Sequence, residues 1–252
     1  MIEELATQVF WLGLLKIIGV NIILSGDNAV VIALAARSLP AKQQKQAVLW
    51  GAGAAVILRI ALTIFAVALL ALPWLKIVGS LLLFWIGIKL LIPEEGEDDI
   101  QASDQMLAAI KTILVADLVM SLDNVIAVAA AAGGSYLLLI LGLAISIPLV
   151  IFGATLLIKL MERFPVIITG GAGLIGWVAG EMLVADIALK GWLTSQGLQY
   201  NAEHPMVGGI QLEWIAGTLG FIFVIALGKW LGNRKQAQSA EAAEEQKPAS
   251  PR

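Results

Sequence analysis

The chain has 252 residues, of which 59% are hydrophobic and 14% are charged, and its mean hydropathy is +0.89. Soluble domains carry about 25% charged residues, so this composition excludes a soluble globule and predicts that lipid surrounds most of the fold. The net charge is only −3, cysteine is absent and histidine occurs once, which excludes disulfides and thiolate metal sites and leaves oxygen atoms as the main metal ligands.

The chain begins with an apolar segment that follows acidic residues. Glu3 and Glu4 stand where a secretory signal has Lys or Arg, and no small-residue cleavage site follows a short apolar core. We therefore expect the first apolar segment to be retained as a membrane span.

Further apolar runs follow along the chain, separated by charge clusters and by Pro and Gly breaks. A spanning helix needs about 20 mostly apolar residues. The pattern predicts an all-α fold, a polytopic membrane helix bundle of about seven spans. The spans are expected near residues 7 to 36, 47 to 71, 74 to 92, 106 to 132, 135 to 158, 165 to 189 and 211 to 231.

Three polar segments are rich in basic residues. By the positive-inside rule all three lie in the cytoplasm, which places the N-terminus outside and the C-terminus inside a cell inner (plasma) membrane. Residues 236–252 contain almost no large apolar side chain and are expected to form a disordered cytoplasmic tail. The basic residues are Arg37, Lys42 and Lys45 after the first span, Lys159 and Arg163 after the fifth, and Lys229, Arg234 and Lys235 after the seventh.

The two halves of the chain resemble each other. The sequence NIILSGDNAV at 21–30 aligns without gaps with DLVMSLDNVI at 117–126, and later Trp85 aligns with Trp177. A three-span unit starts its second copy on the opposite side of the membrane, so the copies are related by an axis in the membrane plane. The chain is thus predicted to consist of two inverted three-helix repeats, at 7–92 and 106–189, and a helix at 211–231.

Inverted repeats are the plan of many transporters, whose substrate binds near the midplane where the copies meet.

Asp27 and Asp123 lie deep in apolar segments, where an ionisable group costs at least about 2.5–3.5 kcal/mol. Six side-chain oxygens from the two copies suit Mn or Mg, or with water Ca. Each observation also has a purely structural explanation. The repeat could reflect a duplication that serves stability alone, and the Asp-Asn pairs could only form hydrogen bonds between helices. The candidate ligands are Ser25, Asp27 and Asn28 in the first copy and Ser121, Asp123 and Asn124 in the second.

Two further polar residues stand about one turn earlier, Asn21 in the first copy and Asp117 in the second. Both are added to the candidate ligands. Ser, Gly, Asp and Asn favour caps and turns, so we expect local unwinding at residues 25–28 that frees backbone carbonyls. Leu122 replaces Gly26 in the second copy, which makes unwinding less expected there.

Other charged residues also lie in or near the spans. Glu181 is expected roughly mid-span as a ligand or proton carrier, while Lys89, at the equivalent position of the first copy, is expected to snorkel or to form an ion pair with it near the surface. Arg59 is expected to pair with one of these acids, or to occupy the cation site itself. Asp186 is expected in a solvated structural role, and His204 in a loop or as a vestibule metal contact.

The sequence shows no nucleotide-binding loop, no catalytic triad and no histidine metal cluster. We therefore expect no enzyme, no prosthetic group and no nucleic-acid partner. The expected partners are a divalent metal ion and the lipid bilayer, and a homo-oligomer is left open.

The motifs Ser25-Gly-Asp27-Asn28-Ala and Ser121-Leu-Asp123-Asn124-Val, with the seven-span layout, resemble the TerC family, most closely its YjbE-type members. The resemblance covers roughly residues 8 to 231. It implies membership of the broader LysE-like group of exporters and Mn(II) as the first substrate, because members are implicated in manganese efflux and in tellurite resistance.

Three functions follow as alternatives. The first is a secondary transporter that exports Mn(II) in exchange for protons, with Glu181 or Asp117 as the carrier. The second is an exporter of a small organic solute. An exposed Arg59 in a pocket would favour this function. The third is a non-transporting membrane partner protein, linked to metal or tellurite resistance, that acts through its loops and acidic tail.

Overall fold

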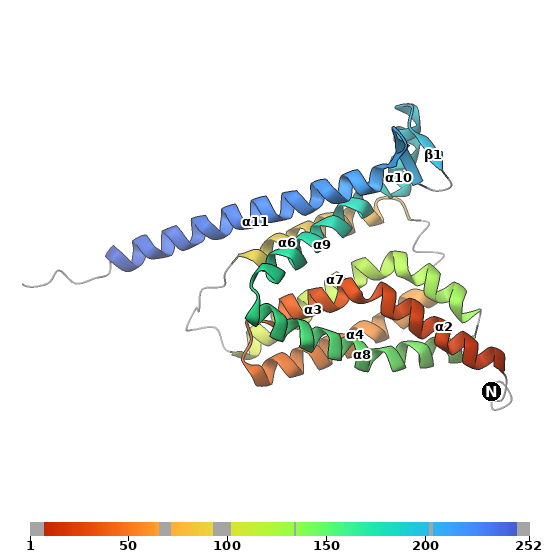
Figure 1. Cartoon of the computed structure of the whole chain (residues 1–252), viewed down its shortest axis with the longest axis horizontal. Helices are drawn as coiled ribbons and strands as arrows, with labels where there is room; N and C mark the ends of the chain where they lie inside the picture. The colour runs from red at the N-terminus through yellow and green to blue at the C-terminus, as the bar shows by residue number, and fades with distance from the viewer. Residues whose placement is uncertain (1–7, 66–71, 93–101, 134, 202–203, 246–252) are drawn as a thin grey trace, which may run out of the picture.

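The computed structural model of the chain describes residues 8–65, 72–92, 102–133, 135–201 and 204–245 (Figure 1). It is mostly helical, as predicted. The helices are α2 (Gln8–Leu24), α3 (Gly26–Ala36), α4 (Ala41–Ile64), α6 (Leu75–Leu91), α7 (Ala102–Ala132), α8 (Tyr136–Arg163), α9 (Val166–Val184), α10 (Ile187–Ser195) and α11 (Leu212–Glu245). The strands are β1 (Gln199–Asn201), β2 (His204–Val207) and β3 (Ile210–Gln211).

Five of the described helices are long and apolar enough to cross a membrane, namely α4, α7, α8, α9 and α11. A sixth span results if α2 and α3 are one span, bent by 49° at the break between them. The 17 residues of α6 would reach about 26 Å as a helix, slightly less than a bilayer core of about 30 Å. Five to six spans are therefore shown, and the expected count of seven stays a prediction.

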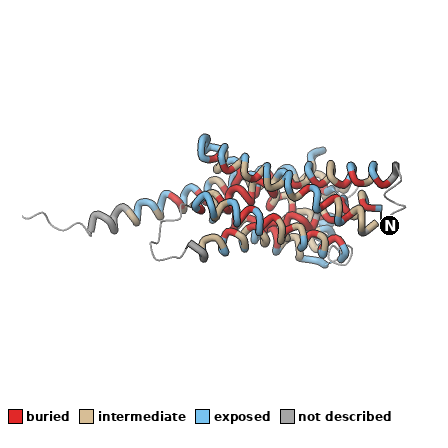
Figure 2. The backbone as a smooth tube through the Cα atoms, turned by 90° about the horizontal axis from the view of Figure 1, so that it is seen from below, coloured by how far each residue is buried: buried red, intermediate tan, exposed pale blue. Residues whose placement is uncertain are grey.

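Exposed residues lie on the outward faces of the helices and buried residues on the inward faces (Figure 2). Many of the exposed residues are large and apolar. Ile57 is 71% exposed, Phe152 68% and Leu219 62%. In water such a surface would aggregate, whereas lipid tails solvate it at no cost.

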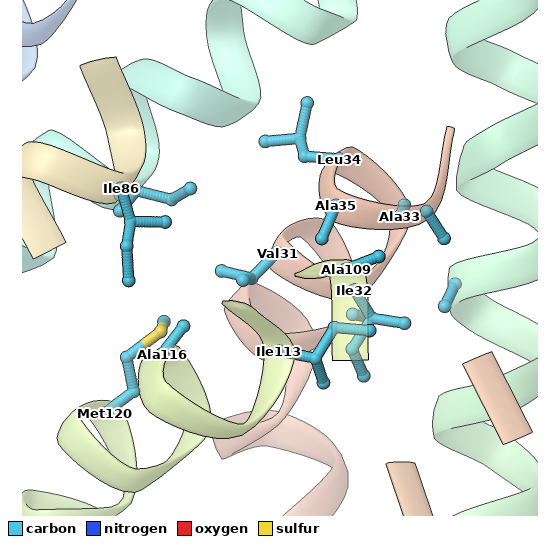
Figure 3. Close-up of a cluster of buried hydrophobic side chains, with 14 of the residues drawn as sticks. Val31, Ile32, Ala33, Leu34, Ala35, Ile86, Ala109, Ile113, Ala116 and Met120 are labelled. Atoms are coloured by element: carbon cyan, nitrogen blue, oxygen red, sulfur yellow. The ribbon is translucent and has the colours of Figure 1, made fainter. Parts of the chain in front are cut away.

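The helices form two groups that pack on each other (Figure 1). In one group α9 lies between α6 and α11. In the other, α4 packs against α7, and α8 packs against α2, α3 and α4. Contacts of α6 with α7 and of α3 with α9 join the groups, and here Val31, Ile86, Ile113 and Met120 meet in the apolar core (Figure 3).

The crossing of α9 and α11 depends on glycine. A Cβ atom at Gly180 would lie 2.1 Å from the carbonyl oxygen of Ala216, and one at Gly176 would lie 2.4 Å from that of Gly220. These are contacts with backbone, which cannot rotate away. Small residues four apart thus let the two helix backbones approach closely, as in many membrane helix pairs.

Two expectations about the C-terminal third are wrong. Helix α11 continues to Glu245, so residues 236–245 are helical rather than disordered, because Ala, Glu, Gln and Lys are strong helix formers; residues 246–252 lie outside the described part. The segment 190–209 is not a plain loop: α10 and a three-stranded antiparallel sheet form there, with Tyr200 opposite Pro205 and Val207 opposite Ile210. The all-α prediction therefore lacked this small sheet.

Candidate functional site

The first copy of the repeated motif lies at a break between two helices. Helix α2 ends at Leu24, Ser25 has φ −106° and ψ 4°, and α3 begins at Gly26. In an unbroken helix the Asn28 N–H would donate to the Leu24 carbonyl; here it donates to Oδ1 of Asp27 at 2.8 Å. The unwinding expected at residues 25–28 is therefore present only at Ser25, because Gly26, Asp27 and Asn28 already belong to α3. Helix α7 runs without a break through the second motif, as the replacement of Gly26 by Leu122 suggested.

The second motif reaches this break. Nδ2 of Asn124 donates to the Leu24 carbonyl at 3.2 Å, across a sequence separation of 100 residues. A carbonyl at the end of a helix has no partner inside the helix, so a side chain from another element supplies one. The two motifs thus meet at the break.

Arg59 of α4 lies at the centre of the polar cluster and is 4% exposed. Its Nε donates to Oγ of Ser121 at 3.0 Å, and its Nη2 forms an ion pair with Oδ1 of Asp117. On the other side its Nη1 donates to Oδ1 of Asn21 at 2.8 Å and to Oγ of Ser25 at 3.2 Å. Asp117 is therefore the acid that pairs with Arg59. Four residues expected as metal ligands accept hydrogen bonds from one guanidinium.

The cluster continues into α8 through a residue that the sequence analysis missed. The Asn21 amide donates to Oγ of Ser146, which is fully buried and donates in turn to the Leu143 carbonyl at 2.7 Å. Oγ of Ser121 donates to Oδ2 of Asp117 at 3.2 Å. The signal for Ser146 was a lone hydroxyl in an otherwise apolar segment, which alone does not separate a network member from a hydroxyl that bonds its own helix.

Asn28 lies at the start of α3 and is 3% exposed, yet among the residues that the structure describes neither its amide oxygen nor its amide nitrogen has a hydrogen-bond partner. Most buried polar atoms are paired, because leaving one unpaired costs about 1–3 kcal/mol. Asp27 beside it is partly buried and lies in the field of the charges on Arg59 and Asp117. A carboxylate and an amide oxygen side by side are ligands suited to a hard cation.

The second half of the predicted metal site is only partly visible. The side chain of Asp123 lies outside the described residues, so the expected meeting of Asp27 and Asp123 stays a prediction. Among the described side chains, no three His, Asp or Glu residues come close enough to hold a metal. A cation site built from the described side chains alone would therefore combine carboxylates with amide, hydroxyl or carbonyl oxygens.

Glu181 does not lie mid-span, because α9 ends at Val184 and places it in the last helical turn, half-buried. Lys89 is exposed in the last turn of α6, with Nζ 5.5 Å from the centroid of the Trp85 ring. The end of α9 adjoins the start of α6 through Asp186, so Lys89 and Glu181 lie at opposite ends of this antiparallel pair. The expected ion pair between them is wrong.

Asp186 is 2% exposed rather than solvated. Its carboxylate accepts hydrogen bonds from the backbone N–H groups of Trp74, Lys76 and Ile77 at the start of α6 and of Ala188 at the start of α10. Burial alone would raise the pKa of Asp186, but these four donors hold the pKa below its ordinary value of 3.8. Its structural role is thus confirmed, in a buried setting.

His204 is part of strand β2, not of a plain loop. Its Nδ1 lies 2.7 Å from Oε2 of Glu213 in the first turn of α11. This contact joins the small sheet to the last helix, and nothing in it indicates a metal contact.

Comparison with known proteins identifies the family. The sequence model of the TerC family of integral membrane proteins matches residues 6–236. The chain belongs to the TerC family. No solved structure matches the chain.

This TerC protein resembles three membrane proteins of Bacillus subtilis (strain 168). It is 44% identical to YjbE over 188 residues, which cover 75% of the chain and 86% of YjbE. It is 26% identical to YkoY over 251 residues, which cover 90% and 74%, and 29% identical to YceF over 194 residues, which cover 71% and 74%. All three are described as uncharacterized membrane proteins. The family and the membrane setting are thereby confirmed, while the LysE-like group stays a prediction.

Proposed function

We propose that this TerC protein is a secondary transporter that exports a divalent metal cation, with Mn(II) as the first candidate. The cation would bind at Asp27, Asn28, Asp123 and Asn124. Asn21, Ser25, Asp117 and Ser121, which accept hydrogen bonds from Arg59, would supply further ligands of the same site. The observation that carries the proposal is the buried, unpaired amide of Asn28 beside the Asp27 carboxylate, at a helix break inside the protein. A cation bound there would satisfy the amide oxygen and offset the burial of the carboxylate.

The packing supports an inverted-repeat transporter. Helices α2 and α3 of the first copy pack on α8 of the second, α4 of the first packs on α7 of the second, and α6 packs on α9. This exchange of partners is expected when a two-fold axis relates the copies. Such an axis would bring the two Asp-Asn motifs together near the midplane.

Orientation and coupling complete the proposal. Basic residues lie at both ends of the α3–α4 connection, in the last turns of α8 and in the C-terminal half of α11. They favour an inner-membrane protein with its N-terminus outside and its C-terminus in the cytoplasm. Export would be driven by proton exchange, with Asp117 or Glu181 as the carrier. The first lies in the central cluster and the second near the outer end of α9.

The burial of Arg59 bears on the organic-solute alternative. An exporter of organic anions would use an exposed guanidinium in a pocket, whereas Arg59 is 4% exposed and directs hydrogen bonds to four residues of the protein. This geometry favours the metal cation.

The proposal is tested in cells that lack their own manganese exporter. Asp27→Ala and Asp123→Ala should each raise cellular manganese and lower manganese tolerance, because each removes a ligand of the cargo. Asp104→Ala, an exposed carboxylate at the start of α7, is the control and should behave like the wild type. Unchanged manganese levels in both aspartate variants, with the proteins inserted in the membrane, would refute the proposal.

A further inference from the structure

Arg59 binds equivalent positions of both copies. In the gap-free alignment Asn21 corresponds to Asp117 and Ser25 to Ser121. The guanidinium donates to the first pair through Nη1 and to the second through Nε and Nη2. One cation carried by α4 therefore joins the two half-sites from which a shared site would be built.

The acceptors of Arg59 are the atoms that a hard cation also prefers. They are an amide oxygen, two hydroxyl oxygens and a carboxylate, from Asn21, Ser25, Ser121 and Asp117. A metal dication and a guanidinium repel each other in a low dielectric, so both cannot bind these oxygens at once.

The shape of the side chain fits this role. Arginine offers five donors in a fixed planar fork. Here three of its nitrogens reach Asn21 of α2, Ser25 at the break after α2, and Asp117 and Ser121 of α7. Lysine carries the same charge at a single point and cannot span both half-sites. The side chain is also long and tethered at one end, so it can leave the oxygens without leaving the protein.

We propose that Arg59 is a tethered counter-cation that competes with the transported metal ion for the oxygens of Asn21, Ser25, Asp117 and Ser121. This inference rests on the proposed function. The cargo binds as the guanidinium withdraws, and the return of the guanidinium expels the cargo. Arg59 thereby sets a weak metal affinity, which an exporter needs for release.

The competing explanation is that Arg59 only joins helices through a buried ion pair. Removal of one partner of such a pair destabilises a protein, but it does not tighten binding of a metal. The affinity for the metal therefore separates the two roles.

The experiment measures Mn2+ binding to purified protein in detergent, from the free Mn2+ signal in electron paramagnetic resonance. Arg59→Gln should bind Mn2+ at least about tenfold more tightly than the wild type and should transport it more slowly in proteoliposomes, because release is lost. Arg59→Lys keeps the charge that pairs with Asp117, so this variant is expected to fold. It should bind Mn2+ a few fold more tightly than the wild type. Lys89→Gln, which removes an exposed positive charge at the end of α6, should bind like the wild type.

The outcomes separate this inference from the proposed function. Unchanged or weaker Mn2+ affinity in the folded Arg59 variants, with normal binding by the wild type, overturns the inference alone. If Arg59→Gln fails to fold, the Arg59→Lys result decides. A wild-type protein that binds no divalent metal overturns the proposed function together with the inference.

Discussion

At the scale of single residues, Asp186 shows how one buried carboxylate organises the end of the helix pair where α9 ends and α6 begins. Its carboxylate accepts hydrogen bonds from the starts of α6 and α10. Trp74, the residue before α6, has a left-handed backbone conformation with φ 71°. Backbone N–H groups at a helix start lack partners within the helix and carry partial positive charge. A single negative charge satisfies both helix starts.

Asp186→Asn should lower the free energy of unfolding by about 1–2 kcal/mol at neutral pH, because the amide replaces a charged cap. Since the folded-state pKa of Asp186 lies below 3.8, its contribution is complete above about pH 3.8 and is lost as the pH falls through the folded-state value. Thermal unfolding in detergent should show a constant difference from pH 8 to 5 that shrinks below pH 3.8. A difference that grows on acidification would contradict this assignment.

The residues of the candidate site were predictable from their types, but their partners were not. Ser, Gly and Asp in an apolar run indicated the helix break, because each favours caps and turns. The sequence also showed that Arg59 needs a buried acid, yet it did not indicate Asp117, because the pairing joins residues 58 positions apart on different helices. Local patterns predict local backbone, whereas the choice of partner depends on packing.

At the scale of helices, the α9–α11 contact sets the spacing of one helix group. Gly180→Val should reduce stability by at least about 1–3 kcal/mol, because the new side chain must displace the backbone of α11 at Ala216. Gly170→Ala is the matched control, since it lies on the same helix with open space around the added Cβ, and it should leave stability unchanged or higher. Thermal unfolding in detergent measures both variants, and equal loss in the two would contradict the role of close approach.

Helix positions followed from the sequence better than helix ends did. Glu181 was expected mid-span because the apolar segment was read as one helix up to residue 189. The structure ends α9 at Val184, and Asp186 caps the start of a new helix, α10. The small sheet was missed because its strands have only two to four residues, too short for an alternating pattern to stand out.

At the scale of the whole molecule, the orientation in the membrane is testable because the chain contains no cysteine. Ser38→Cys, at the end of α3, should react with a membrane-impermeant maleimide only after the cells are opened. Ser195→Cys, at the end of α10, should react in intact cells whose outer surface is accessible to the reagent. The reverse labelling pattern would invert the orientation. Labelling of both positions from one side would contradict a topology in which they lie on opposite faces.

The helical membrane bundle could be read from the sequence because it rests on long apolar segments, while the inverted arrangement of the two similar halves stays a prediction. The central cluster could not be read from the sequence, since it depends on which faces of α2, α4, α7 and α8 turn inward. The structure shows that these four helices direct Asn21, Arg59, Asp117 and Ser146 into one network.

The central claim is that Asp27 and Asn28 hold the transported cation, and uptake of Mn2+ into proteoliposomes tests it most directly. Asn28→Leu removes an amide that has no hydrogen-bond partner, so stability should be unchanged or higher, yet the Mn2+ flux should fall by on the order of 10-fold or more. Asp27→Asn should reduce the Mn2+ flux at least as much as Asn28→Leu does. Wild-type flux in both folded variants would contradict the account.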